Sequence, residues 1–294
     1  MAAAETEEAV NQWRKAIASW RCGDTLYMSI PFTWLLPEAR ERAKAHDGRI
    51  VVGGPGAQLM REKIDWADVG ADCPFDPLAF HNPAACFFSR GCPNACPFCC
   101  VPKIEGDWRE AWPGRIGPMV CDNNLLAAPK GYFSRVIEAL RVFCYVDFNQ
   151  GLEAGRFTDW HAEQLSLLPS VKVRFAWDRL GEERAVATAV ARARRAGLRD
   201  FGIYVLIGYK DAPDDALYRL ETIRQWKIWP NPMRFQPLDA ENKDAYVAPG
   251  WTDRELRRMM RYWSRQRWLG GVPYADYEPE DELPLLRPEG RVDR

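Results

Sequence analysis

Three cysteines within residues 87–106 have the spacing of a metal-binding loop. They are Cys92, Cys96 and Cys99, in the arrangement C-x3-C-x2-C. Neighbouring glycine and proline residues favour turns over a helix, so the thiolates can fold back onto one small centre. A structural zinc site takes four ligands, and a fully ligated iron–sulfur cluster takes four thiolates. Because we expect the side chain of Cys100 to point away from that of Cys99, the loop predicts three ligands and one open metal position.

The context of these cysteines points to a family. Phe98 directly precedes the third cysteine, and residues 84–89 form a strand-like lead-in. On these features the stretch resembles the radical S-adenosylmethionine (SAM) enzymes. The resemblance implies that the three cysteines hold a [4Fe-4S] cluster and that the amino and carboxylate groups of SAM chelate the fourth iron. It further implies that an electron from a flavodoxin or ferredoxin type donor is used to cleave SAM to a 5'-deoxyadenosyl radical.

Two other interpretations of the loop remain. It could belong to a zinc-binding module, or to a cluster that transfers electrons without catalysing a reaction on a substrate. A radical enzyme would produce 5'-deoxyadenosine, whereas a zinc module would not. The residue that acts on the final substrate is not identified by the sequence.

Composition sets limits on the fold and the compartment. The chain has 294 residues, 47% of them hydrophobic and 28% charged, as expected for one large globular domain with an extension. A formal net charge of −1 argues neither for nor against a nucleic-acid partner. Nine cysteines are an odd count, which argues against a disulfide framework. With no run near the roughly 18 apolar residues of a membrane span, we expect a cytoplasmic protein that does not enter membranes.

The first 82 residues form a short α/β extension in our prediction. We expect a helix over residues 6–20, a strand over 26–30, a helix over 34–45 and a strand over 49–52. The glycine-rich segment 53–56 follows, and we interpret it as a structural turn because Leu59 replaces the last glycine of a dinucleotide-binding fingerprint.

Residues 51–60 resemble the cobalamin-binding domain that precedes the barrel in one branch of the radical SAM family. That domain supplies a histidine from an Asp-x-His-x-x-Gly pattern. Neither His46 nor His81 fits, because Lys44 and Ala79 occupy the aspartate position. We therefore predict a truncated, Rossmann-like extension over residues 1–82 that does not bind cobalamin.

From residue 83 to about 240, strands and helices alternate. We expect strands over 85–89, 119–121, 144–148, 171–176, 201–208 and 233–236, and helices over 132–141, 159–168, 182–196 and 214–226. Six strands with helical crossovers predict a parallel sheet. An eight-unit barrel needs about 250 residues. The stretch has room for about six units of about 30 residues each. The predicted fold is therefore α/β, a partial (β/α)6 TIM-like barrel.

Chemistry in such sheets lies beyond the carboxyl ends of the strands, so we expect the SAM-binding residues there. The resemblance places the amino group of SAM near the hydrogen-bond acceptors that follow the second strand. It also places an adenine-binding Gly-x-Ile-x-Gly-x-x-Glu element at residues 204–211. In this element Gly208 matches the pattern and Asp211 replaces the glutamate. An arginine in the fourth strand would either clamp a carboxylate of SAM or pair with a neighbouring protein carboxylate. The predicted SAM-binding set is Phe98, Asp122, Asn123, Asn149, Gln150, Arg174, Asp178, Gly208 and Gln236.

The C-terminal segment, residues 241–294, contains a predicted helix over 252–268 followed by a proline-rich acidic tail. Thr252 and Glu255 form a capping box at its start. Arginines alternate with aromatic residues along this helix, and Arg257 and Arg261 could contact the phosphates of a nucleotide or nucleic acid. The alternative is a solvated face whose arginines pair with the acidic tail. A peptide side chain and a small metabolite remain alternative substrates.

Overall fold

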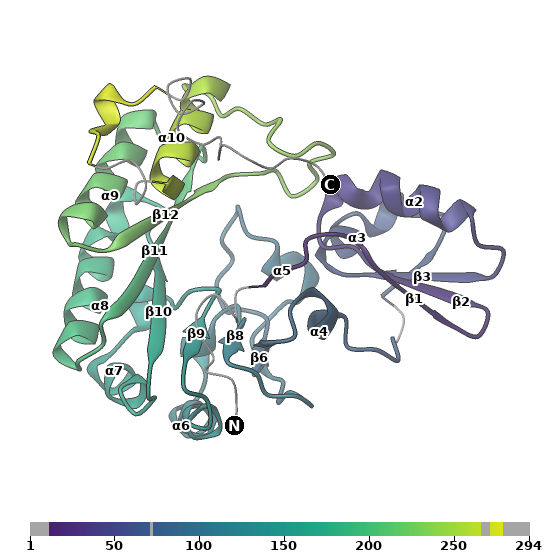
Figure 1. Ribbon diagram of the computed structural model, residues 1–294, viewed down its shortest axis with the longest axis horizontal. Helices are drawn as coiled ribbons and strands as arrows, with labels where there is room; N and C mark the ends of the chain where they lie inside the picture. The colour runs from purple at the N-terminus through teal and green to yellow at the C-terminus, as the bar shows by residue number, and fades with distance from the viewer. Residues whose placement is uncertain (1–11, 71–72, 266–270, 279–294) are drawn as a thin grey trace, which may run out of the picture. The chain divides into compact units, whose positions relative to one another are not determined.

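A computed structural model describes residues 12–70, 73–265 and 271–278 of the chain (Figure 1). These residues form two compact units. Unit 1 contains the described residues of Met1–Ala176, Arg184–Phe201 and Gln236–Tyr246, and unit 2 contains those of Trp177–Glu183, Gly202–Phe235 and Val247–Arg294.

A four-stranded sheet begins unit 1. Its strands are β1 (Ala18–Cys22), β2 (Thr25–Ser29), β3 (Arg49–Gly53) and β4 (Asp68–Val69), in the order β1-β2-β3-β4. The first pair is antiparallel and the other two pairs are parallel. Helix α2 (Leu36–Lys44) lies along this sheet (Figure 1) and buries Ala39 and Ala43 in the same apolar cluster as Met28, Ile30 and Val52. The strands and helix predicted for residues 26–52 are confirmed.

The helix predicted over residues 6–20 is wrong where the structure describes it, because residues 12–17 are not helical and the next five form β1. Gly23 adopts a left-handed conformation with φ of 57°, and Cys22 faces Thr25 across a two-residue turn. A glycine at the first position of such a turn suits the twist of a β-hairpin. The ring of Trp20 stacks on that of Phe75, with centroids 5.6 Å apart. Trp20 therefore packs from a strand and not from a helix. The first residues of the predicted helix lie outside the described part.

The glycine-rich turn after β3 packs against the backbone that follows β2. Gly54 has φ of 86°, and a Cβ added there would lie 2.7 Å from the carbonyl oxygen of Ile30. A Cβ on Gly56 would lie 2.5 Å from the carbonyl carbon of Phe32. Helix α3 (Pro55–Leu59) starts inside this turn. The glycines are therefore required for close backbone packing.

A second sheet has six strands in the order β12-β11-β10-β9-β8-β5. They are β5 (Ala85–Cys86), β8 (Met119–Val120), β9 (Val146–Phe148), β10 (Val171–Ala176), β11 (Asp200–Ile207) and β12 (Trp229–Arg234). The pairs β5–β8, β8–β9, β9–β10 and β11–β12 are parallel. The predicted α/β class with a parallel sheet is confirmed. Closure into a barrel is not detected in the described residues, since β5 and β12 remain the two ends of the strand order.

Four helices follow the strands as predicted. They are α6 (Lys130–Leu140), α7 (Asp159–Leu165), α8 (Glu183–Arg195) and α9 (Pro213–Gln225). In unit 1, α6 buries apolar residues at helical spacing, including Phe133, Val136 and Leu140. Shorter elements complete this part of the chain: α4 (Pro77–His81), β6 (Ser89–Arg90), α5 (Val101–Ile104) and β7 (Arg109–Glu110).

In unit 2, helices α9 and α10 (Asp253–Arg265) contact strand β12 (Figure 1). The strand predicted at residues 233–236 instead runs from Trp229 to Arg234, and its first part was missed because it contains Pro230 and Pro232. Prolines argue against a central strand but are tolerated at a sheet edge, which is the position of β12. Within the described residues, no helix is both long and apolar enough to cross a bilayer.

Candidate functional site

The three predicted cluster cysteines occupy one loop of unit 1, between β6 and α5 (Figure 1). Cys92, Cys96 and Cys99 are half-buried, and none is in a disulfide. In the described part of the chain, no group of three or more His, Cys, Asp or Glu side chains is arranged so that it could hold a metal ion. The thiols thus share a loop without forming a preassembled centre. Ligands that gather only when the metal binds would have this starting arrangement, because metal binding can be coupled to local folding.

Glu105 holds the base of this loop. Its carboxylate accepts hydrogen bonds from Arg90 Nη2 at 2.6 Å, from the Gly91 backbone N–H at 2.9 Å and from Asn123 Nδ2 at 2.6 Å. The side chain of Glu105 is only 10% exposed, so these contacts are shielded from water. Glu105 therefore ties the start of the loop to the segment that follows β8. Asn123, predicted to bind SAM, supports the loop in this way.

Gly91 enters the loop in a conformation that favours glycine. Its φ is 75°, and a Cβ added there would lie 2.1 Å from the carbonyl oxygen of Asp107. Gly106 has a similar φ of 70°, but a Cβ there would meet nothing within 4 Å. A side chain at either position would therefore strain the backbone, but only a side chain at position 91 would also clash with a neighbouring atom.

We expect Gly91→Ala to lower the free energy of unfolding much more than Gly106→Ala. Both alanines carry the left-handed backbone penalty of about 1–2 kcal/mol. Only Gly91→Ala must also displace the Asp107 carbonyl. Urea denaturation of the two variants measures the difference, and equal losses would show that the loop moves freely at Gly91.

The sulfur of Cys92 accepts two N–H hydrogen bonds. The Asn94 backbone N–H donates at 3.4 Å, and Asn124 Nδ2 donates at 3.5 Å. Asn124 Nδ2 also donates to Glu153 Oε2 at 2.6 Å. Asn124 is 3% exposed, and its Oδ1 has no hydrogen-bond partner among the described residues. Buried acceptors normally have a hydrogen-bond partner, so this oxygen is available to a donor from outside the protein.

Asn124 belongs to the polar segment predicted to accept hydrogen bonds from the ammonium group of SAM, but the predicted SAM-binding set named only Asp122 and Asn123 from it. Side chains alternate in an extended segment, so Asp122 and Asn124 lie on one side and Asn123 on the other. Asn123 accordingly contacts Glu105, whereas Asn124 contacts Cys92 and Glu153. Glu105 was also missed, because it acts through contacts with distant segments. Glu153 follows the third strand and was a candidate for binding ribose; in the structure it accepts from Asn124 and Arg156.

Asp122, predicted to bind SAM, is enclosed by the protein. It is 3% exposed, and it accepts hydrogen bonds from the Phe88 N–H at 3.0 Å and from Ser89 Oγ at 2.5 Å. Burial raises the pKa of Asp122 to about 6, against the lowering effect of these hydrogen bonds. Its contacts fix the strand segment that leads into the cysteine loop.

We expect Asp122 to make stability depend on pH. The native pKa of about 6 exceeds the ordinary value of 3.8, so between these values the folded protein keeps a proton that the unfolded chain has released. The free energy of unfolding should therefore fall as pH rises from about 4 to about 6, by the order of 3 kcal/mol. Denaturation at several pH values tests this. Asp122→Asn should reduce the slope without abolishing it, because the pKa of Asp178 is also raised to about 6. An unchanged slope in that variant would assign the effect elsewhere.

Cys100 lies closer to its neighbour than expected. Its thiol forms a hydrogen bond with Cys99, which lowers the pKa of Cys100 to about 7. The expectation that these two side chains point apart is therefore wrong. Cys100 is the residue before α5, where the chain turns into a helix, so the alternation of an extended loop does not apply.

Arg174 forms a buried ion pair with Asp147, which is fully buried on the adjacent strand β9. Arg174 thus pairs with a protein carboxylate, which was the alternative to its clamping a carboxylate of SAM. Gln236 exchanges two hydrogen bonds with Asp244, at 2.8 and 3.1 Å. Asn149 and Gln150 follow β9, half-buried and exposed respectively, and Phe98 is half-buried in the cysteine loop. The role of each in SAM binding stays a prediction.

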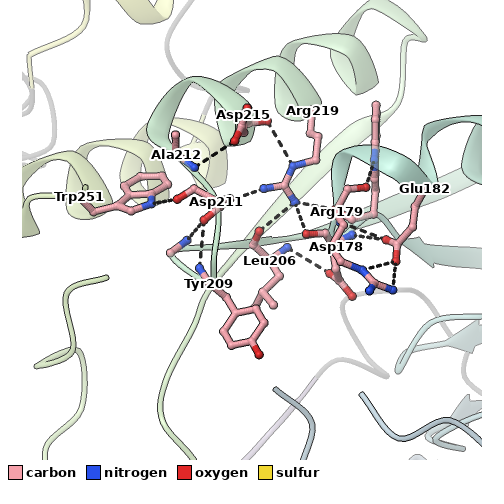
Figure 2. A network of polar contacts seen from close by, with 12 residues as sticks. Asp178, Arg179, Glu182, Leu206, Tyr209, Asp211, Ala212, Asp215, Arg219 and Trp251 are labelled. Carbon is pink, nitrogen blue, oxygen red and sulfur yellow. Dashed lines mark hydrogen bonds and ion pairs between the residues drawn. The ribbon is translucent and has the colours of Figure 1, made fainter. Parts of the chain in front are cut away.

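A second cluster of polar contacts lies in unit 2 and centres on Arg219 of α9, as Figure 2 shows. Arg219 is fully buried, and its Nη1 donates to the carbonyls of Trp177, Asp178 and Leu206 at 2.9, 2.9 and 3.0 Å. Nη2 pairs with Asp211 at 2.5 Å. This arginine therefore links the backbone at the end of β11 to the segment that follows β10.

Two predicted SAM-binding residues belong to this cluster. Asp178 Oδ1 accepts from the Leu206 N–H at 3.3 Å, and burial, followed by the nearby Glu182, raises the pKa of Asp178 to about 6. Gly208 has φ of 76°, and its N–H donates to Asp211 Oδ1 at 3.0 Å. The Asp178 carboxyl group and the Tyr209 ring extend away from α9 (Figure 2). Asp178 is thus held at a strand end.

The arginines of α10 are engaged with nearby acidic residues and carbonyls. Arg257, predicted to contact substrate, pairs with Asp253 at 2.6 Å, and Arg254 pairs with Glu278 at 3.0 Å. Arg258 donates to the carbonyl of Tyr274 at 2.7 Å. Arg261 is half-buried one turn beyond Arg257. These pairs agree with the alternative of a solvated helix face.

No protein-family model matches this sequence, and no curated protein matches it.

Proposed function

We propose that this protein is a radical SAM enzyme. The observation that carries the proposal is the C-x3-C-x2-C loop, whose first sulfur, Cys92, is placed to accept hydrogen bonds from Asn94 and Asn124. N–H donors stabilise negative charge on sulfur, so this environment suits a cysteine that binds metal as a thiolate. Three thiolates leave one iron of a [4Fe-4S] cluster open, which argues for a cluster that binds a further ligand.

The donor set fits such a cluster chemically, because all its members are cysteines. Cys92, Cys96 and Cys99 would hold the cluster, and Glu105 and Gly91 would shape the loop around it. When bound, the cluster and SAM supply one-electron cleavage of SAM to a 5'-deoxyadenosyl radical. Asn124 Oδ1, buried and without a partner among the described residues, would accept a hydrogen bond from an ammonium group such as that of SAM. We assign this role to Asn124 because Asp122 already accepts two protein hydrogen bonds.

The finer fold assignment, a partial (β/α)6 barrel, belongs to the same proposal. It is supported by a strand order that follows the sequence from β5 to β12 without a reversal. In such a fold Asp178 and Gly208 follow strand ends, where ribose and adenine would be contacted. The proposal includes a reducing cytoplasmic setting, a flavodoxin or ferredoxin type electron donor, and no cobalamin. The substrate class remains open between a nucleotide or nucleic acid, a peptide and a small metabolite.

Anaerobic reconstitution tests the proposal directly. The purified protein, given iron and sulfide, should bind about four of each per chain. With SAM and dithionite, it should then release 5'-deoxyadenosine, detected by liquid chromatography and mass spectrometry. A protein that retains one zinc per chain and releases no 5'-deoxyadenosine would instead be a zinc-binding module.

A further inference from the structure

The Asn124 side chain lies between a cluster cysteine and a carboxylate. Its Nδ2 is 3.5 Å from Cys92 Sγ and 2.6 Å from Glu153 Oε2. One amide nitrogen carries two hydrogens, so it can serve both acceptors at once. At 3% exposure, water does not compete strongly for these hydrogens.

Glu153 determines which end of the amide faces the sulfur. If the amide were flipped, its oxygen would face the carboxylate, and two acceptors at that separation would repel each other. Glu153 is itself fixed by Arg156 Nε, which donates to the same Oε2 at 2.8 Å. The charged pair therefore directs the N–H group of Asn124, and not its carbonyl, toward Cys92.

We infer that Asn124, oriented by Glu153, is a positioning residue that raises the reduction potential of the cluster through its hydrogen bond to Cys92. This inference rests on the proposed function. A reduced cluster carries one more negative charge, part of which resides on the cysteine sulfurs. A hydrogen bond to sulfur stabilises that charge and so favours reduction, since hydrogen bonds to the sulfurs are among the factors that set cluster potentials. Asn124 acts through Cys92 and need not touch the substrate.

Two variants remove the donor while keeping the size of the side chain. Asn124→Leu removes all polarity, and Asn124→Asp replaces the donor with an acceptor. The matched control is Asn94→Ala, in the same loop, because Asn94 donates to Cys92 through its backbone N–H and an alanine retains that group. Far-UV circular dichroism and thermal melting establish that each variant is folded.

The measurement is a potentiometric titration of the reconstituted cluster, followed by the electron paramagnetic resonance signal of its reduced form. We expect both Asn124 variants to shift to a more negative potential, Asn124→Asp further than Asn124→Leu, while Asn94→Ala matches the wild type. Loss of iron and sulfide from both folded Asn124 variants would overturn the inference, because Asn124 would then be needed to retain the cluster and not to set its potential. An unchanged potential in loaded Asn124→Leu would overturn the inference and leave the proposed function standing. Absence of a cluster in the wild type would instead refute the proposed function.

Discussion

Three single substitutions, Cys92→Ala, Cys96→Ala and Cys99→Ala, should each abolish cluster loading and the release of 5'-deoxyadenosine. Each cysteine supplies one of the three thiolates, and two thiolates in one loop do not retain a four-iron cluster that needs three from the protein. Iron and sulfide content after anaerobic reconstitution, together with product analysis, measures both losses. The expected reduction is to the background of the assay in all three variants.

Cys100→Ala is the matched control for these variants. Cys100 adjoins Cys99 and shares a hydrogen bond with it, yet it is not one of the three proposed ligands. This variant should keep its iron and sulfide. If Cys100→Ala lost the cluster and Cys99→Ala kept it, the third ligand would have been assigned to the wrong cysteine.

Replacing Arg219 with leucine should destabilise the protein by about 3–5 kcal/mol, the usual result of removing one partner from a buried ion pair. Arg219 is fully buried, and the side chain of Asp211 is 9% exposed, so the variant leaves a carboxylate in a nearly dry site. Three carbonyls also lose their donor. Urea denaturation, followed by the fluorescence of the tryptophans, measures the change.

Arg224→Ala, on the same helix, is the control for Arg219→Leu. Arg224 pairs with Glu221 at 2.6 Å, but its side chain is 56% exposed. A surface pair of this kind contributes about 0–1 kcal/mol. Similar losses in the two variants would show that the Arg219 cluster is open to solvent.

Much of the fold could be predicted from local sequence. The strand over 171–176 and the helices of the parallel sheet follow from apolar runs, periodicity and stop signals such as Gly197, whose φ is 87°. The failures have local causes too. Trp13 and Trp20 match a helical period, but the turn at Gly23 pairs β1 with β2, and hairpin pairing overrides the apparent period.

The site was only partly visible in the sequence. Cysteine spacing is a local signal, so the loop could be identified. The contacts that support it are long-range: Asn124 reaches Cys92 across 32 positions, and Arg219 reaches Trp177 across 42. Such partners are set by how strands and helices meet, which no single segment encodes. The hydrogen bonds that Asp122 accepts from Phe88 and Ser89 are likewise long-range, and the sequence did not reveal them.

The prolines of β12 also bear on how this protein meets other chains. Pro230 and Pro232 face Ile203 and Val205 of β11, and both lack an N–H group. Within a sheet, proline is confined to positions whose nitrogen points away from the neighbouring strand. The outer edge of β12 therefore lacks an N–H donor at both Pro230 and Pro232. A further strand, from this chain or another molecule, would find no donors at these positions. The sheet is therefore protected at β12 against edge-to-edge association, the usual route from an exposed strand to aggregation.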